Sequence, residues 1–248
     1  MIKVLALVFD EHKILRPLDC IESFNIEYKT ITPDFILSKP YPDIIITVSD
    51  WRADIARILI DAKKRNIPTL IFQDGTLDWI IHNEGEKYGG GGGPTHFHPI
   101  LADKIAVIGR QSARTISAWN NPNKIEITGF PKLQNQINNF NSSKCFQIRK
   151  NPVSVLITST RQGWFSEKHK KYFINALNDL KKYFIENPNY NVTWRLSRNL
   201  SETINVKNNL KEKESNELVN SIKKADLVIS AQSTAVIEAM LCNKPVAI

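Results

Sequence analysis

The chain has 248 residues, of which 42% are hydrophobic, and a formal net charge of +8. This composition favours one large or two ordinary folded domains over disorder, and no apolar run approaches the roughly 20 residues of a membrane-spanning helix. Its three scattered cysteines, Cys20, Cys145 and Cys242, show no CxxC spacing and support neither a disulfide framework nor a zinc site, so we expect a soluble protein of the reducing cytoplasm.

Residues 1–131 alternate short apolar runs with helical patterns, which is typical of a parallel α/β domain. Continuous apolar strands of this kind are buried on both faces. The predicted strands occupy residues 3–9, 25–31, 43–49, 68–74, 104–109 and 124–129. Helical spacing of apolar residues predicts helices over 51–66 and 112–119.

Residues 132–152 are polar and rich in asparagine, and they predict a linker between two domains. A second α/β series occupies residues 153–248. Its predicted strands are 153–160, 191–197, 226–230 and 245–248, and its predicted helices are 167–186, 214–224 and 233–242. Because a sheet ending on the last of these strands would leave apolar surface bare, we expect the second domain to be incomplete and the natural protein to be longer.

The positive charge lies in the second half of the chain. Residues 1–130 contain 15 Lys and Arg against 16 Asp and Glu, whereas residues 131–248 contain 18 against 9. This excess indicates either an anionic ligand or lysine-rich helical faces in solvent. No nucleic-acid-binding motif and no interleaved aromatic pattern accompanies it, so we expect no nucleic acid partner.

The turn after the predicted strand 226–230 is a candidate anion site. Ligands of open parallel sheets bind where strands end and helices begin, and Gln232, Ser233 and Thr234 are small or polar residues at such a point. Glu238 follows about one helical turn later and could accept hydrogen bonds from a ribose diol. The alternative is that Ser233 is only a helix cap and that Glu238 pairs with a nearby lysine.

The pattern of this turn (S-T, three residues, E-A-M-L, then N-K-P-V) resembles the donor-site segment of GT-B glycosyltransferases and their relatives. These include lipid-A-disaccharide synthase, UDP-N-acetylglucosamine 2-epimerase and the CDP-glycerol glycerophosphotransferases. Residues 102–133, which end in G-F-P-K-L, look like the end of a GT-B N-terminal domain.

The resemblance implies two Rossmann-like α/β domains that face each other across a cleft. It places an acceptor on residues 1–131 and a nucleotide-sugar donor on residues 153–248. An acidic residue at the position of Glu238 commonly binds the nucleotide ribose in those families, and Ser233 and Thr234 match their phosphate-binding turn.

Further donor contacts are expected at two other strand ends. The resemblance places Ser159, Thr160 and Arg161 in a loop that faces the donor phosphates. Arg195 ends the second predicted strand of this half, and its forked guanidinium could bind a phosphate. A surface ion pair is the alternative reading for both arginines.

On the acceptor side, Asp74 and His98 are the candidate catalytic residues. Transfer to a hydroxyl group needs a base, and Asp74 follows a predicted strand directly. An aspartate before glycine is also a favoured turn former, which is the alternative for Asp74. His96 lies two residues before His98 in T-H-F-H-P, and Glu84 is a weaker candidate base. We expect no metal ion and no separate cofactor.

The expected function is therefore metal-independent transfer of a sugar from a nucleotide-activated donor to a saccharide or glycolipid acceptor, as in surface polysaccharide or capsule assembly. A nucleotide-sugar epimerase of the same fold and a non-catalytic nucleotide-binding module are the alternatives. A glycolipid acceptor would bring the protein into peripheral contact with the inner face of the membrane.

Overall fold

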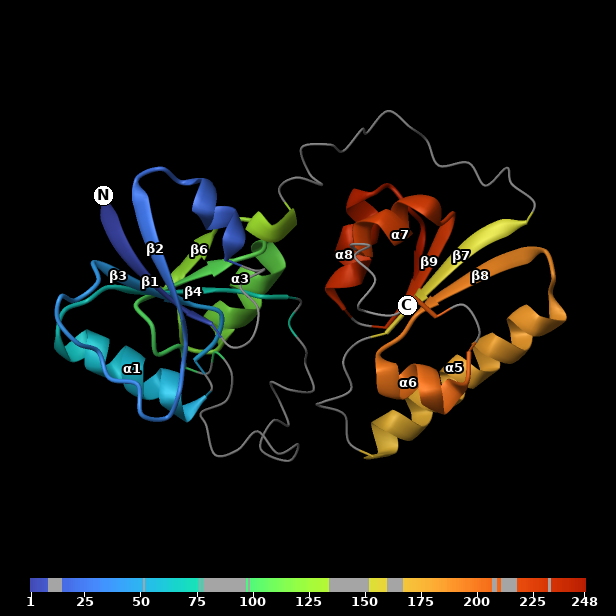
Figure 1. Cartoon of the computed structure of the whole chain (residues 1–248), viewed down its shortest axis with the longest axis horizontal. Helices are drawn as coiled ribbons and strands as arrows, with labels where there is room; N and C mark the ends of the chain where they lie inside the picture. Colours follow the sequence, from blue (N-terminus) through green and yellow to red (C-terminus); the bar gives the residue numbers. More distant parts are fainter. Residues whose placement is uncertain are drawn as a thin grey trace. The chain divides into compact units, whose positions relative to one another are not determined.

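The computed structural model contains two compact units, Met1–Gln134 and Asn135–Ile248 (Figure 1). The structure describes residues 1–8, 15–50, 52–75, 77, 97, 99–133, 152–159, 167–206, 209–210, 218–231 and 233–248. Within these ranges, only the backbone is described for Arg16, Pro17, Lys132, Glu167, His169 and Arg198.

The first unit is built on a six-stranded parallel sheet in the order β2-β1-β3-β4-β5-β6. The strands are β1 (Ile2–Val8), β2 (Phe24–Thr30), β3 (Ile44–Thr47), β4 (Thr69–Phe72), β5 (Lys104–Val107) and β6 (Ile125–Ile127). The helices are α1 (Ala53–Lys64), α3 (Arg110–Ala118) and the short 3-10 helices η2 (Arg16–Cys20) and η4 (Pro131–Leu133). All six predicted strands and both predicted helices are present, but the predicted strands 43–49, 68–74, 104–109 and 124–129 each continue two residues too far.

Apolar side chains cover both faces of this sheet. On one face, Leu7, Ile45 and Ile105 pack with the buried stripe of α1 and with Ile116 of α3. The other face, which is formed by alternate residues of the same strands, packs beneath Leu15 and η2. Burial on both sides explains why these strands are continuous apolar runs.

The second unit contains a four-stranded parallel sheet in the order β10-β9-β7-β8. Its strands are β7 (Val153–Thr158), β8 (Tyr190–Arg195), β9 (Leu227–Ser230) and β10 (Val246–Ala247). Its helices are α5 (Glu167–Glu186), α6 (Arg198–Ile204), α7 (Leu218–Lys224) and α8 (Thr234–Leu241). Helices α5 and α6 cover one face of the sheet, and α7 and α8 cover the other (Figure 1).

Two predictions for this unit were wrong in detail. The predicted strands 153–160 and 191–197 each continue two residues too far, because β7 ends at Thr158 and β8 ends at Arg195. Helix α6 was not predicted. It has only 7 residues, and its N-cap residue Ser197 makes no capping hydrogen bond through its side chain, so the sequence carries a weak helix signal there.

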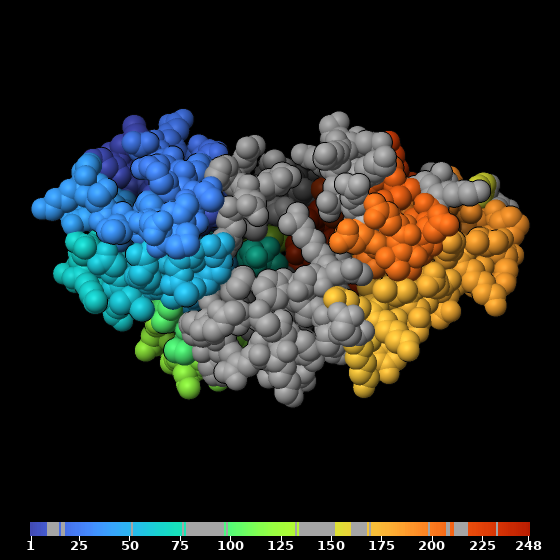
Figure 2. Space-filling view, turned by 60° about the horizontal axis from the view of Figure 1, so that its bottom comes forward, coloured from blue at the N-terminus to red at the C-terminus, as the bar shows by residue number. Residues whose placement is uncertain are grey.

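The long helix α5 lies at the surface of the second unit, where Figure 2 shows its yellow and light-orange atoms. Its lysines at 168, 171 and 182 are exposed, as expected for a solvated helical face. This helix therefore accounts for part of the positive charge of the second half without a ligand. Within the described ranges, no helix is both long enough and apolar enough to cross a bilayer.

An aspartate fixes the strand register at the amino ends of both sheets. Asp43 precedes β3 and accepts a 2.8 Å hydrogen bond from the amide of Lys3 in the neighbouring strand β1. In the same way, Asp103 before β5 accepts from the Thr69 amide at 2.9 Å, and Asp226 before β9 accepts from the Ser154 amide at 3.0 Å. Each carboxylate joins the start of one strand to the start of its neighbour, which opposes a slip in register.

Four helices end at an asparagine in the left-handed region of backbone conformation. Asparagine tolerates positive φ better than other residues with a side chain, so it can replace the usual glycine at a helix end. The four residues, with their φ angles, are Asn66 (57°), Asn120 (62°), Asn205 (50°) and Asn243 (54°).

Candidate functional site

A row of three polar residues closes the carboxyl end of the second sheet. In the strand register, Thr158 at the end of β7 lies beside Arg195 of β8 on one side and Ser230 of β9 on the other. Leu156 lies two residues before Thr158 in β7, and Val228 lies two residues before Ser230 in β9. Both belong to the core beneath α7 and α8. Since side chains alternate along a strand, Thr158 and Ser230 lie on that same face, and the apolar face therefore ends in a polar row.

A chain of hydroxyl groups links this row to the start of α8. The Thr158 hydroxyl donates to Ser230 Oγ at 2.8 Å, and Ser230 Oγ lies 3.1 Å from Ser233 Oγ. Ser233 in turn is the N-cap of α8, because its Oγ accepts from the Ala235 amide at 3.2 Å. The capping role that the alternative reading gave to Ser233 is confirmed, and the positive end of the α8 dipole is held against the ends of β7 and β9.

Arg195 contributes a half-buried cationic group beside this row. Among the side chains that the structure describes, only Arg195 Nη1 and Ser49 Oγ are buried polar atoms without a hydrogen-bond partner. Buried donors are almost always paired, so each such atom needs an explanation. A guanidinium nitrogen of this kind, beside Thr158 at the carboxyl end of the sheet, is suited to an anion.

Glu238 lies in the buried stripe of α8. Its side chain is 4% exposed, and the helix also buries Ala235 and Ala239. Helical spacing places Glu238 one turn after Thr234, as the sequence implied. A glutamate is almost never buried to this extent unless it has polar partners, so the burial of Glu238 is unusual for its residue type. Contact between Glu238 and a ribose stays a prediction.

The ends of β7 and β8 are also joined on the opposite face of the sheet. Ser159 Oγ accepts a 3.1 Å hydrogen bond from the Ser197 amide, which fixes the turn that leads into α6. Asn209 holds the same turn, since its Oδ1 accepts from the Leu196 amide at 2.9 Å. Ser159 thus has a structural role in the described residues, and its expected contact with phosphate is untested.

In the first unit, Gln73 braces the turn that carries Asp74. Gln73 is 3% exposed; its Nε2 donates to the Gly75 carbonyl at 2.7 Å, and its Oε1 accepts from the Ile108 amide at 3.0 Å. These bonds fix the turn after β4 to the end of β5. Asp74 lies on this turn and is exposed, so its carboxylate is presented at the carboxyl end of the sheet.

Asp50 is a buried acid at the same edge of the first sheet, and it was not predicted from the sequence. Its side chain follows β3 and is 1% exposed. Its carboxylate accepts from the Leu101 amide at 2.9 Å and from the Phe97 amide at 3.5 Å. Burial raises the pKa of Asp50 above its ordinary value, although these amides and Lys124 oppose this change.

Asn121 holds the segment around Phe97 and Ile100 from the other side. Its Oδ1 accepts from the Ile100 amide at 3.0 Å, and its Nδ2 lies 3.0 Å from the Phe97 carbonyl and 2.9 Å from that of Trp119. Phe97 has a φ of 60°, in the left-handed region that is unfavourable for a bulky side chain. Asp50 and Asn121 together maintain this strained backbone.

Four of the predicted site residues, His98, Thr160, Arg161 and Gln232, lie outside the described residues, as do His96 and Glu84. The structure therefore brings Arg195, Ser233 and Thr234 to one edge of the second sheet and adds Thr158 and Ser230 to them. Within the described ranges, no three His, Cys, Asp or Glu side chains gather into a cluster that could hold a metal ion.

No family model matches the chain, and no curated protein is recognisably similar to it in sequence. Solved structures are similar in fold. A complex of Staphylococcus aureus MnaA with UDP has a TM-score of 0.67 at 11% identity, over 99% of this chain and 79% of that one.

Two further structures show the same similarity. UDP-GlcNAc 2-epimerase from Neisseria meningitidis, bound to UDP-GlcNAc, has a TM-score of 0.64 at 15% identity, over 99% of this chain and 82% of that one. A variant of the wall teichoic acid polymerase TagF has a TM-score of 0.56 at 11% identity, over 99% of this chain and 69% of that one. The chain has the GT-B fold of these proteins, as its resemblance to that superfamily implied.

Asp50 makes stability depend on pH in a predictable direction. Because its pKa is raised in the folded chain, the folded state holds this proton more tightly than the unfolded state does. Its contribution to stability is therefore fully present below the ordinary value of 3.8 and is lost as the pH rises from there to the raised value. A tenfold difference in proton affinity between the two states corresponds to about 1.4 kcal/mol of stability.

We expect the melting temperature of the wild type, measured relative to that of Asp50→Asn, to fall as the pH rises through this window. Above the window this difference should be constant. Thermal unfolding between pH 4 and pH 8 measures it. Asp34→Asn, at an exposed site, is the matched control. A difference that is constant with pH would show that burial does not control this carboxyl group.

Proposed function

We propose that the chain is a metal-independent glycosyltransferase that moves a sugar from a nucleotide-activated donor to a surface polysaccharide or glycolipid. The observation that carries this proposal is the polar row at the carboxyl end of the second sheet: Thr158 and Ser230 are hydrogen-bonded to the capped start of α8, and Arg195 pairs with Thr158 in the strand register. GT-B neighbours solved with UDP and with UDP-GlcNAc support a nucleotide-sugar ligand. The wall teichoic acid polymerase among them supports a role in surface polymer assembly.

In this proposal the second unit binds the donor. The diphosphate lies at the start of α8, where the helix dipole and the nearby Arg195 offset its charge. Both interactions also stabilise the diphosphate as it leaves, and this takes the place of a metal ion. Glu238 accepts hydrogen bonds from the ribose, which requires this buried carboxylate to become accessible to the bound nucleotide.

The first unit supplies the base. Asp74 accepts the proton of the acceptor hydroxyl as that oxygen attacks the anomeric carbon, and the bond from this carbon to the diphosphate breaks. Exposure of Asp74 on a braced turn supports this role, since the acceptor must reach it. His98 is the second candidate for the same task.

Loss of the Glu238 carboxylate should weaken nucleotide binding. Calorimetric titration with UDP, CDP, GDP and CMP is expected to identify one diphosphate that binds well, and Glu238→Gln should reduce its affinity about ten-fold or more, because a hydrogen bond to a charged group contributes about 1.5–3 kcal/mol. Glu186→Gln, at an exposed position in α5, should have no effect.

Arg195→Gln gives a second, independent readout in the same titration. This substitution should reduce the affinity for the diphosphate more than the affinity for the corresponding monophosphate, because in the proposal the guanidinium faces the phosphates rather than the base. If the wild type bound all four nucleotides equally and feebly, the proposed donor site would be excluded, and the proposed transferase function with it.

Asp74→Asn should abolish sugar transfer and leave nucleotide affinity unchanged. The amide keeps the size of the side chain but cannot take up a proton at neutral pH. Transfer from a radiolabelled nucleotide sugar to a membrane extract measures activity, and titration measures affinity. Full activity of this variant would remove Asp74 as the base and leave His98 to be tested by His98→Gln.

A nucleotide-sugar epimerase is the second candidate, because the similar structure from Neisseria meningitidis is a UDP-GlcNAc 2-epimerase. An epimerase converts the donor sugar itself and needs no acceptor. Incubation of the chain with UDP-GlcNAc alone, followed by chromatography of the sugars, separates the two enzymes. Nucleotide binding without either activity would instead indicate a non-catalytic module.

A further inference from the structure

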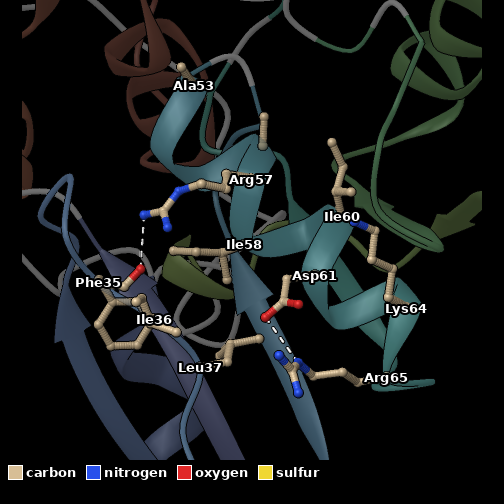
Figure 3. Close-up of a pocket in the computed structure, with 11 residues that line it drawn as sticks. Phe35, Ile36, Leu37, Ala53, Arg57, Ile58, Ile60, Asp61, Lys64 and Arg65 are labelled. Carbon is tan, nitrogen blue, oxygen red and sulfur yellow. Dashed lines mark hydrogen bonds and ion pairs between the residues drawn. The ribbon is translucent and has the colours of Figure 1, made fainter.

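The first unit contains an open groove between α1 and the segment that leads from β2 to β3 (Figure 3). Its volume is about 580 Å³. The groove is predominantly apolar, and its floor is formed by Leu37 and Ile58, which are 5% and 2% exposed. The lining residues are Phe35, Ile36, Leu37, Ala53, Ala56, Arg57, Ile58, Ile60, Asp61, Lys64 and Arg65.

Two large apolar side chains of this groove are exposed to solvent. Ile36 is 68% exposed and Ile60 is 48% exposed, and they come from the two opposite walls. A scattered exposed isoleucine needs no explanation, but these two border one predominantly apolar groove and add to its exposed apolar surface. Such a surface is stabilised when another apolar group covers it.

Three cationic side chains, Arg57, Lys64 and Arg65, line the α1 side of the same groove together with Asp61. Arg57 donates to the carbonyl oxygen of Phe35 at 2.8 Å (Figure 3) and to that of Pro33 at 2.7 Å, so both of these partners are neutral. Lys64 and Arg65 lie at the end of α1 and line the groove. Only Arg65 has a carboxylate partner in a described ion pair, Asp61 at 3.0 Å.

We propose that this groove is a docking site for anionic lipid at a membrane surface, with Ile36 and Ile60 entering the acyl region and Arg57 and Lys64 binding headgroup phosphates. Apolar side chains next to lysine and arginine are the combination by which proteins lie on anionic bilayers. The apolar floor of the groove suits an acyl chain better than a small soluble anion, which would leave the isoleucines exposed.

A second copy of the chain fits the groove less well than a lipid. In a symmetric dimer the same surface meets itself, so Arg57 and Lys64 would face like charges. A lipid with an anionic headgroup instead complements the cations and the apolar floor at the same time. This inference does not depend on the proposed transferase, because its test contains no nucleotide.

Vesicle flotation tests the inference with the intact chain. Vesicles of phosphatidylcholine alone are compared with vesicles that also contain phosphatidylglycerol, at low and at high salt. The chain should float with the anionic vesicles only, and high salt should reduce binding, because screening weakens the contribution of the cations.

Substitutions in the groove should reduce this binding selectively. We expect the Ile36→Ser, Ile60→Ser double variant and the single variant Lys64→Glu each to lower the partition coefficient about ten-fold, since each removes apolar burial or reverses a charge near the anionic surface. Ile185→Ser and Lys182→Glu are the matched controls, because Ile185 is 71% exposed and Lys182 is exposed in α5.

Three results would overturn the inference. The first is no flotation with anionic vesicles at low salt, and the second is equal loss of binding in the α5 controls. The third is a dimer in sedimentation that Ile36→Ser and Ile60→Ser dissociate, which would assign the groove to a second copy. Unchanged melting curves for every variant ensure that loss of binding reflects the groove and not unfolding.

Discussion

Parallel strand pairing is the constraint on which this structure depends. Every strand pair in the described parts of both sheets is parallel, so each sheet has all its strand starts at one edge and all its strand ends at the other. Connections must then cross over the faces, and the helices bury both of them. The loops after the strands consequently collect at a single edge, which is where Arg195, Thr158 and Ser230 align.

Much of this fold could be predicted from the sequence because burial on both faces leaves a strong signal. An uninterrupted apolar run such as that of β1 indicates a buried strand or a buried helix, and its short length of 7 residues favours the strand. Helix α6 had no such signal, since it is short and is positioned by contacts of Leu200 and Ile204 with the sheet. Tertiary packing, rather than local propensity, defines that helix.

The candidate site could be predicted only in part. The cap at Ser233 and the position of Arg195 follow from local sequence, because both lie next to a strand end. Thr158 and Ser230 were missed because a hydroxyl residue that ends an apolar strand looks like part of the strand, and only the register shows that they are neighbours. Asp50 was missed for a similar reason, since its partner Leu101 is 51 positions away in the chain.

The aspartates at the amino ends have a consequence for how this architecture can change. Asp43 and Asp103 secure strand alignment at the amino end of the first sheet, and Asp226 does so at the amino end of the second. The loops at the carboxyl ends of the strands contain none of these three residues. Those loops can therefore be lengthened, shortened or replaced while the alignment is preserved. A designer who wished to graft a new specificity onto this scaffold could exchange these loops, provided that the three carboxylates and the hydrogen bonds of Gln73 and Asp50 were left in place.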